Sequence, residues 1–180
     1  MSTDHDSLVP EFPDFDGLPR FGQVPDDLHS DYVGGAFETC SICDQALPAA
    51  EAYEVQKVMR AGECIFEMAI CLRCVRGLMK DYSEESLAVI AEIGEQGIGR
   101  ASRGSCEFCS VPREGVHEYT SIAVCRTDFL LTPLITLCEE CVDGLHAKLS
   151  KTTRDRFEEF IRDNFPGVPE GMDLPVTTLV

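Results

Sequence analysis

Hydrophobic and polar residues alternate along four segments of the chain, and this two-residue period predicts β-strands. The four segments are 53–59, 64–70, 117–125 and 129–137. Short polar stretches at 60–63 and 126–128 separate the members of each pair and are typical of turns. The sequence therefore predicts two β-hairpins.

Hydrophobic residues at helical spacing follow each predicted hairpin. The hydrophobic positions are Leu87, Ile90 and Ala91 in the first helix, and Phe157, Phe160, Ile161 and Phe165 in the second. Ser83 precedes two acidic residues, which is typical of a helix N-terminus, and Gly94 ends that pattern. In the second helix Thr152 is the predicted cap, with Asp155 three residues later, and Pro166 is the predicted stop. We interpret the aromatic stripe as part of a core.

Eight of the ten cysteines form four C-x-x-C pairs that repeat along the chain. The pairs are Cys40 with Cys43, Cys71 with Cys74, Cys106 with Cys109, and Cys138 with Cys141. The last two pairs follow the first two at offsets of 66 and 67 residues, and Tyr53 with Tyr119 and Ser83 with Ser150 obey the same offsets. The sequence therefore predicts a tandem duplication in an α+β fold. Each small zinc-binding unit reads as a C-x-x-C knuckle, a β-hairpin, a second C-x-x-C and an α-helix.

The composition divides the chain into five predicted regions. They are an acidic N-terminal arm rich in proline and aromatic residues (1–39), a first zinc-binding unit (40–93), a glycine-rich linker (94–105), a second zinc-binding unit (106–165) and a C-terminal tail (166–180). The prolines of the arm remove backbone donors, so we expect it to be extended, either disordered or lying along its own domain.

The cysteine spacing indicates metal binding. Two sulfurs three residues apart lie on one side of a tight turn, and two such turns form the tetrahedral cage that Zn²⁺ prefers. A disulfide framework is disfavoured in a reducing compartment, and a thioredoxin-like pair needs one C-x-x-C in a βαβ setting. Each unit is also too short to fold readily without a staple, and structural Zn²⁺ contributes on the order of 10–16 kcal/mol of binding free energy.

The order of knuckle, hairpin and a second knuckle that opens a helix resembles the treble-clef class of four-cysteine zinc fingers. The resemblance covers residues 40–93 and 106–165, and it implies two structural Zn²⁺ ions. One ion would be held by Cys40, Cys43, Cys71 and Cys74, and the other by Cys106, Cys109, Cys138 and Cys141. Treble-clef knuckles often carry glycine after the second cysteine, whereas Asp44 and Ser110 stand there. The class includes nucleic-acid readers, ubiquitin-pathway modules and nucleases, so it transfers no single function.

The ligand spacing is also similar to that of rubredoxins, in which four cysteines hold one redox iron. Val75 and Val142 follow the later pairs here, where rubredoxins usually carry glycine. An iron electron carrier is therefore the alternative to a structural zinc protein.

Two cysteines and two histidines near the pairs need separate interpretation. Cys64 and Cys125 lie outside the pairs and do not map onto each other, and we interpret both as small buried hydrophobic residues. His117 and His146 lie near the second set, but four cysteines are already available there. We interpret both histidines as surface or core residues and not as ligands.

The net charge and the apolar segments of the chain argue against nucleic-acid and membrane proteins. The chain carries 15 Lys and Arg against 32 Asp and Glu, a net charge of −17, which argues against a nucleic-acid surface. No apolar run is long enough to span a bilayer, and the acidic N-terminus differs from a signal peptide, so we expect a cytoplasmic protein without membrane contact. A regulator that touches nucleic acid through Arg73, Arg76 and Lys80 is a further alternative.

No catalytic motif is complete in the sequence. His117 and Glu118 begin like the zincin motif, but no second histidine follows at the required position. A site with four cysteine ligands is closed to a catalytic water. We therefore expect no enzyme, but an acidic scaffold or regulator that binds another protein. The sequence leaves a homodimer open and does not identify the partner.

Overall fold

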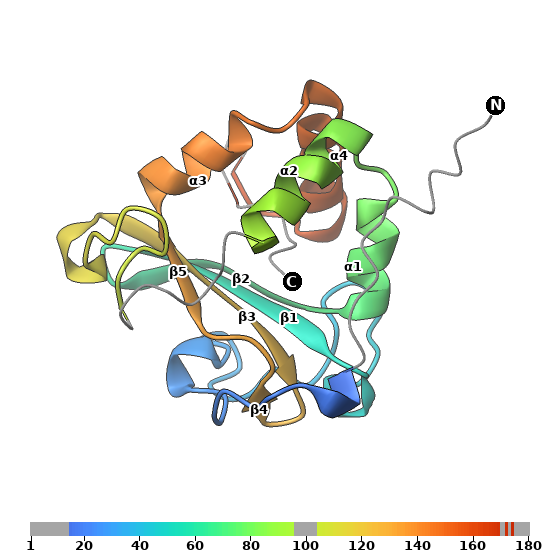
Figure 1. Cartoon of the computed structure of the whole chain (residues 1–180). Helices are drawn as coiled ribbons and strands as arrows, with labels where there is room; N and C mark the ends of the chain where they lie inside the picture. The colour runs from blue at the N-terminus through green and yellow to red at the C-terminus, as the bar shows by residue number, and fades with distance from the viewer. Residues whose placement is uncertain (1–14, 96–103, 170–171, 173, 175–180) are drawn as a thin grey trace.

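The computed structural model describes residues 15–95, 104–169, 172 and 174. It confirms the α+β fold: a five-stranded antiparallel sheet is accompanied by four α-helices (Figure 1). The start of the predicted arm (1–14), most of the predicted linker (96–103) and most of the tail beyond 169 lie outside the described residues.

The sheet contains strands from both predicted units. β1 (Tyr53–Arg60) and β2 (Glu63–Cys71) form the first hairpin, and β3 (Glu118–Arg126) is followed by β4 (Phe129–Leu130) and β5 (Ile135–Cys138). The strand order is β2-β1-β3-β4, and β5 also pairs with β3. Because β1 pairs with β3 along its whole length, the two units meet inside one sheet. The predicted domain boundaries themselves stay a prediction.

The register between β1 and β3 relates the two units by a local two-fold axis. Gln56 lies opposite Ile122, which is its own equivalent 66 residues later in the chain. An antiparallel pair that places a residue opposite its repeat equivalent has a two-fold axis at that point. The pairing of β1 with β3 is therefore the contact that an isologous dimer of the two units would make.

The return strand of the second hairpin is shorter than the sequence pattern indicates. The alternation predicts one strand over 129–137, but β4 and β5 are separated by residues 131–134. The amides of Leu131 and Thr132 both donate to the carbonyl of Val124, and Pro133 has no amide hydrogen to continue the ladder. The strand therefore breaks where proline removes a donor.

Four helices follow the hairpins in two equivalent pairs. α1 (Leu72–Met79) and α2 (Glu84–Glu95) belong to the first unit, and α3 (Glu139–His146) and α4 (Lys151–Asn164) to the second. Figure 1 shows α2, α3 and α4 on one side of the sheet. Hydrophobic residues of α2 and α3 pack there against β3 and β5; the buried members are Ile93, Ile122, Ile135, Leu137 and Val142.

The cap of α4 differs from the prediction. Thr152 is the predicted cap, but the helix begins at Lys151 and Ser150 is its N-cap, whose side chain accepts a hydrogen bond from the amide of Thr153 at 3.2 Å. The prediction was wrong because the sequence offers three hydroxyl residues near this helix start, and only Ser150 both caps the helix and contacts Ser83 and Ser86 at the start of α2.

The N-termini of α2 and α4 meet in a reciprocal hydrogen-bond cluster. The amide of Ser83 donates to Thr153 Oγ1, and the amide of Ser150 donates to Ser86 Oγ, both at 2.9 Å. The two bonds are equivalent, because Ser150 and Thr153 stand 67 residues after Ser83 and Ser86. Ser83 Oγ also lies 2.8 Å from Ser150 Oγ. Ser86 and Thr153 are fully buried, so the cluster satisfies polar groups that would otherwise be costly. It is the second contact about the two-fold axis.

The described part of the N-terminal arm, residues 15–39, lies along the opposite side of the sheet from the helices (Figure 1). The amides of Phe21 and Val24 donate to the carbonyls of Leu130 and Asp128 at 3.0 and 2.9 Å, and Leu28 is buried. The arm therefore covers backbone groups of β4 that would otherwise form an open edge.

The aromatic stripe of α4 contributes to the core as the sequence pattern predicts. Phe157 and Ile161 are buried, and Phe160 and Phe165 are partly buried against the same cluster. The Phe165 ring packs edge-on against Phe66 of β2, with 5.3 Å between the ring centroids. The end of α4 is thereby held against the outer edge of the sheet.

Candidate metal centres

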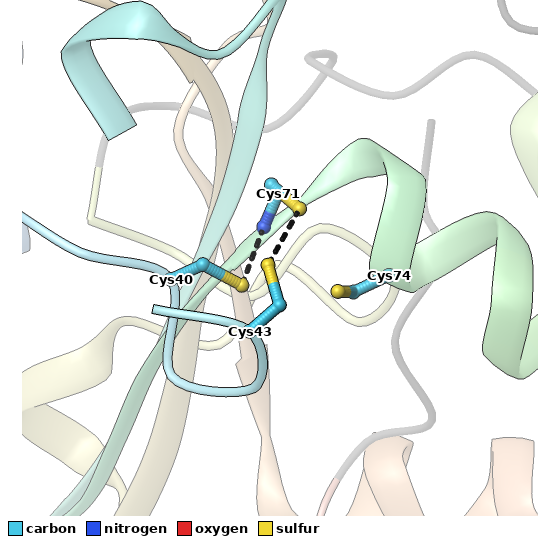
Figure 2. Close-up of side chains that lie close together, drawn as sticks. All are labelled: Cys40, Cys43, Cys71 and Cys74. Carbon is cyan, nitrogen blue, oxygen red and sulfur yellow. Dashed lines mark hydrogen bonds between the residues drawn. The ribbon is translucent and has the colours of Figure 1, made fainter. Parts of the chain in front are cut away.

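The first four-cysteine set joins a loop, a strand and a helix. Cys40 and Cys43 lie in the loop before β1, Cys71 is both the last residue of β2 and the N-cap of α1, and Cys74 lies in the first turn of α1. Figure 2 shows the four sulfurs facing one another. Their Sγ atoms all lie within 4.8 Å of one another.

The second set repeats this arrangement. Cys106 and Cys109 lie in the loop before β3, Cys138 ends β5 and caps α3, and Cys141 lies in the first turn of α3. Their Sγ atoms also lie within 4.8 Å of one another. Each predicted quartet therefore comes together within its own unit, and the structure mixes no sulfur between the two. Their role as metal ligands stays a prediction.

Local backbone hydrogen bonds shape each knuckle. The amide of Cys40 donates to the carbonyl of Gln45 at 2.8 Å, and the amide of Asp44 donates to the carbonyl of Cys40 at 3.1 Å. The second knuckle has the same bonds: the amide of Cys106 donates to the carbonyl of Val111 at 2.8 Å, and the amide of Ser110 donates to the carbonyl of Cys106 at 2.9 Å. The chain thus reverses tightly enough to bring both sulfurs of a pair to one side.

Asp44 and Ser110 adopt a backbone conformation that glycine commonly supplies in tight turns. Their φ angles are 57° and 61°, in the left-handed region. Short polar side chains tolerate this region better than branched ones, at a modest cost in free energy. The absence of glycine after the second cysteine therefore does not prevent the knuckle.

Each knuckle is fixed to the edge strand that carries the later pair. The amide of Ser41 donates to Ala69 of β2, and the amide of Glu107 donates to Thr136 of β5, both at 2.8 Å. A second bond joins the cysteines directly: the amide of Cys71 donates to Cys40 Sγ at 3.3 Å (Figure 2). Its equivalent in the other unit, from Cys138 to Cys106, measures 3.4 Å. These bonds hold each knuckle beside the end of the strand that carries the later cysteine pair.

The sulfur separations fit metal coordination and not disulfides. Cys43 Sγ lies 3.7 Å from Cys71 Sγ, and Cys109 Sγ lies 3.6 Å from Cys138 Sγ. Tetrahedral zinc with Zn–S bonds of about 2.3 Å requires about 3.8 Å between sulfurs, whereas a disulfide needs about 2.05 Å. None of the ten cysteines forms a disulfide. The chemistry of the donor set therefore suits a tetrahedral, thiophilic ion.

The thiols of each set cannot all ionise easily without a cation. The amide of Gln45 and the Arg73 guanidinium lower the pKa of Cys43 to about 6. Burial and the neighbouring sulfurs of Cys43 and Cys71 raise the pKa of Cys74 far above its ordinary value. Like charges in one small volume repel, and a bound dication removes this conflict.

The second set shows the same opposition between its members. Burial acts to raise the pKa of Cys106, but the amides of Cys109 and Cys138 outweigh it and bring the pKa to about 7. Burial and the sulfurs of Cys138 and Cys106 raise the pKa of Cys141. Each set thus contains one thiol whose pKa is lowered and one whose pKa is raised, so that a bound cation would favour the loss of its proton.

Arg73 contacts the first four-cysteine set, a position that the sequence analysis did not predict. It lies between the two cysteines that open α1, and one of its guanidinium nitrogens donates to Cys43 Sγ at 3.5 Å. The sequence groups Arg73 with Arg76 and Lys80 as a basic patch. Its position inside a C-x-x-C is the signal that could have indicated a role beside the sulfurs, because the charge would stabilise thiolates.

The cysteines and histidines outside the quartets agree with their predicted burial only in part. Cys125 is fully buried, as predicted, whereas Cys64 is only partly buried and lies beside Asp31 and Glu67, so its interpretation as a core residue was wrong. His117 is exposed, and neither histidine belongs to a four-cysteine set.

Comparison of the chain with protein-family models, with curated proteins and with solved structures finds no match. Among the described residues, no helix has both the length and the apolar character needed to cross a membrane.

Proposed function

We propose that each four-cysteine set holds one structural Zn²⁺ and that the protein is a non-catalytic scaffold that binds another protein. The observation that carries this proposal is the closure of two separate quartets within 4.8 Å, each linking a loop knuckle to the N-terminus of a helix. A metal at such a junction fixes the helix to the sheet edge, which is a structural task.

The donor set supports a structural and not a catalytic metal. All four ligand positions of a tetrahedral ion are filled by sulfur, so no position is left for water or substrate. The knuckle, hairpin and helix of each unit follow the order of the treble-clef class, which supports zinc as the ion. We therefore infer that the chemistry at these centres ends with coordination.

The surface supports a protein partner. Eight ligand thiolates and two dications change the net charge from −17 to about −21, which disfavours contact with nucleic-acid phosphates. Four large hydrophobic side chains are nevertheless exposed among the described residues: Phe21, Tyr32, Val33 and Phe108. Exposed aromatic residues within an acidic surface are typical of contacts between proteins.

Metal analysis with folding measurements tests the structural part of this proposal. We expect two equivalents of zinc per chain, no visible absorption, and loss of the far-ultraviolet circular dichroism signal when EDTA removes the metal. Cys74→Ser should reduce the zinc content to one equivalent, whereas Cys64→Ser, the matched control, should retain two. An unchanged spectrum after verified metal removal contradicts a structural role, and visible iron–thiolate absorption would favour the electron carrier.

Protein partners can be tested with the same material. Zinc-loaded protein should retain a partner from native lysate, and metal removal should abolish this retention. Titration with DNA and RNA at low salt should show no binding. Retention that is unaffected by metal removal, or binding to either nucleic acid, contradicts the scaffold role.

A further inference from the structure

An open groove of about 1110 Å³ follows the outer edge of β2. One wall is the segment 30–41, which runs from the N-terminal arm into the first knuckle, and the other is the segment 164–168 at the end of α4. Residues 64–67 of β2 form the floor between them. The groove therefore lies where the two layers that cover the sheet approach the same edge strand.

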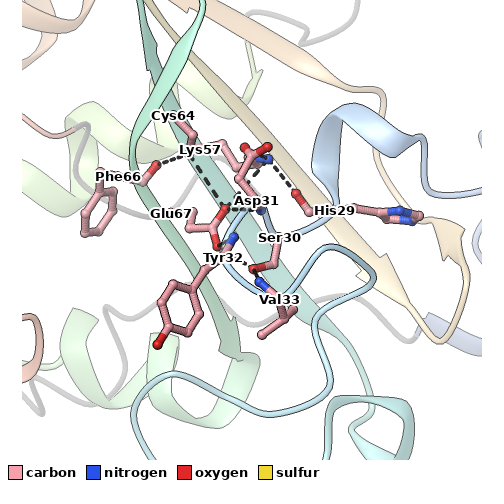
Figure 3. A network of polar contacts seen from close by, with 9 residues as sticks. All are labelled: His29, Ser30, Asp31, Tyr32, Val33, Lys57, Cys64, Phe66 and Glu67. Atoms are coloured by element: carbon pink, nitrogen blue, oxygen red, sulfur yellow. Dashed lines mark hydrogen bonds and ion pairs between the residues drawn. The ribbon is translucent and has the colours of Figure 1, made fainter.

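A polar network fixes the first wall to the strand (Figure 3). Glu67 accepts hydrogen bonds from the Ser30 hydroxyl and from the amides of Asp31 and Tyr32, at 2.5, 2.8 and 3.3 Å. Lys57 Nζ lies 2.6 Å from Asp31 Oδ2 and 3.7 Å from Glu67 Oε2. Since this ammonium pairs with both carboxylates beside Cys64, the cluster of Asp31, Cys64 and Glu67 is an ion-pair network and not a third metal site.

The network directs apolar side chains outward. Tyr32 is 94% exposed and Val33 is 64% exposed, although their backbones are anchored at Glu67 and Ser30. Figure 3 shows the Tyr32 ring pointing away from the polar network. An anchored backbone that presents exposed apolar side chains loses little conformational entropy when a partner covers them.

The groove has a strong excess of negative charge. Its lining contains four acidic residues, Asp31, Glu38, Asp44 and Glu67, and no Lys, Arg or His. Lys57 compensates one of these charges, so about three remain. Cys40 also lines the groove, and a zinc ion with four thiolates carries a charge of about −2.

The second unit lacks these acids at the equivalent positions. By the 66- and 67-residue offsets, Glu38, Asp44 and Glu67 correspond to Gly104, Ser110 and Leu134. The second knuckle and its strand form without them, so neither the fold nor the cysteine quartet requires the acidic residues. The charge is therefore a separate property of the first unit.

The edge of β2 offers backbone groups to the same groove. The outward amide of Ala69 donates to the Ser41 hydroxyl oxygen, and the Ala69 carbonyl accepts a hydrogen bond from the Ser41 amide. By the two-residue period of a strand, the amide and carbonyl of Glu67 point the same way, beyond the reach of that knuckle. An extended peptide could pair there as an added strand.

We propose that this groove binds an extended segment of a partner protein in which basic residues alternate with apolar ones. The inference rests on the proposed scaffold function and specifies its surface. The basic side chains contact Glu38 and Asp44, and the apolar side chains pack on Tyr32 and Val33. Charge complementarity selects this occupant, because an acidic or neutral segment leaves the groove carboxylates desolvated without a counter-charge.

Fluorescence anisotropy with the full zinc-loaded chain tests the proposal. The probe is a labelled nonapeptide of alternating lysine and valine, and a peptide of alternating glutamate and valine is the control. We expect saturable binding of the lysine peptide alone, weakened when salt rises from about 0.05 M to about 0.3 M. Glu38→Gln with Asp44→Asn should weaken it about three- to tenfold.

Two further variants separate a specific groove from general attraction. Asp81→Asn with Asp143→Asn removes the same charge from exposed positions outside the groove and should leave the affinity unchanged. Tyr32→Ala should weaken binding by about fivefold with no loss of stability, because the ring is exposed.

Three results would overturn the inference: no binding of the lysine peptide, equal effects of the two charge pairs, or a chain that dimerises through this groove and excludes the peptide. Zinc content is measured on every sample. Failure of the peptide to bind a chain that holds two zinc ions refutes the groove alone, whereas loss of zinc without loss of fold refutes the structural-metal proposal.

Discussion

Glu54 is a buried carboxyl group whose removal should change how stability depends on pH. It lies on central strand β1, is 2% exposed, and neither carboxyl oxygen has a hydrogen-bond partner among the described residues. Burial disfavours the charged form and raises the pKa of Glu54 from 4.5 to about 8. Glu54→Gln keeps the shape of the side chain and removes the titration.

The sign of the effect follows from proton linkage. Between pH 4.5 and about 8 the folded chain retains a proton that the unfolded chain has lost, so stability decreases as pH rises through this window. At 1.36 kcal/mol for each unit of pKa difference, the decrease relative to acid conditions is about 3 kcal/mol at pH 7. It reaches about 5 kcal/mol above pH 9 and then stays constant.

Guanidinium unfolding of both proteins with zinc present measures this difference. The stability of Glu54→Gln relative to wild type should increase by about 2 kcal/mol between pH 6 and pH 8 and level off near pH 9. Both proteins carry the same cysteine sets, so the pH dependence of metal binding cancels. Burial also raises the pKa of nearby Cys125, to about 12, so that thiol stays neutral in this window.

Exposed Glu51 provides the matched control, and Glu51→Gln should show no pH-dependent difference from wild type. A difference between Glu54→Gln and wild type that is constant over this pH range would refute the reasoning. It would mean that Glu54 ionises in the folded state as easily as in the unfolded chain.

Four other substitutions test three separate features of the fold. Cys138→Ser should leave one equivalent of zinc and lower the melting temperature of the whole sheet, because β5 pairs with β3; a sheet that melts unchanged contradicts this. Thr153→Val removes the acceptor of the Ser83 amide and should cost about 1–3 kcal/mol in chemical denaturation, as should Ser86→Ala at the equivalent position. A cost in only one of them contradicts the reciprocal cluster. Thr127→Gly should stabilise by about 1 kcal/mol, since this β-branched residue has a φ of 56°, and a loss of stability contradicts that backbone strain.

Features set by short-range spacing were accessible from the sequence. Both sulfurs of a C-x-x-C lie in one turn. The alternation over 53–59 and 64–70 predicts a hairpin, and the observed strands are longer only by Arg60, Glu63 and Cys71. The quartets follow from the same logic, because a hairpin returns its second pair to the first. Local backbone geometry is sufficient for each of these predictions.

Features that depend on contacts between distant segments of the chain could not be predicted from local sequence. Lys57 and Glu54 are polar in sequence, and only the layers on both faces of β1 make them buried. Ser150 is chosen as a cap over Thr152 because it meets the N-terminus of α2. Ser83 lies 67 residues from Ser150 in the chain, and Lys57 binds His29 and Asp31, which lie 28 and 26 residues before it.

Each sulfur quartet, with its hairpin and helix, could be predicted from the amino-acid sequence, because residues close in the chain fix its geometry. The pairing of β1 with β3, which places Gln56 opposite its own repeat equivalent, and the acidic groove at the edge of β2 became visible only in the folded chain. A strand edge carries the same backbone donors and acceptors whatever its sequence, so the choice of partner is made by burial across the whole fold.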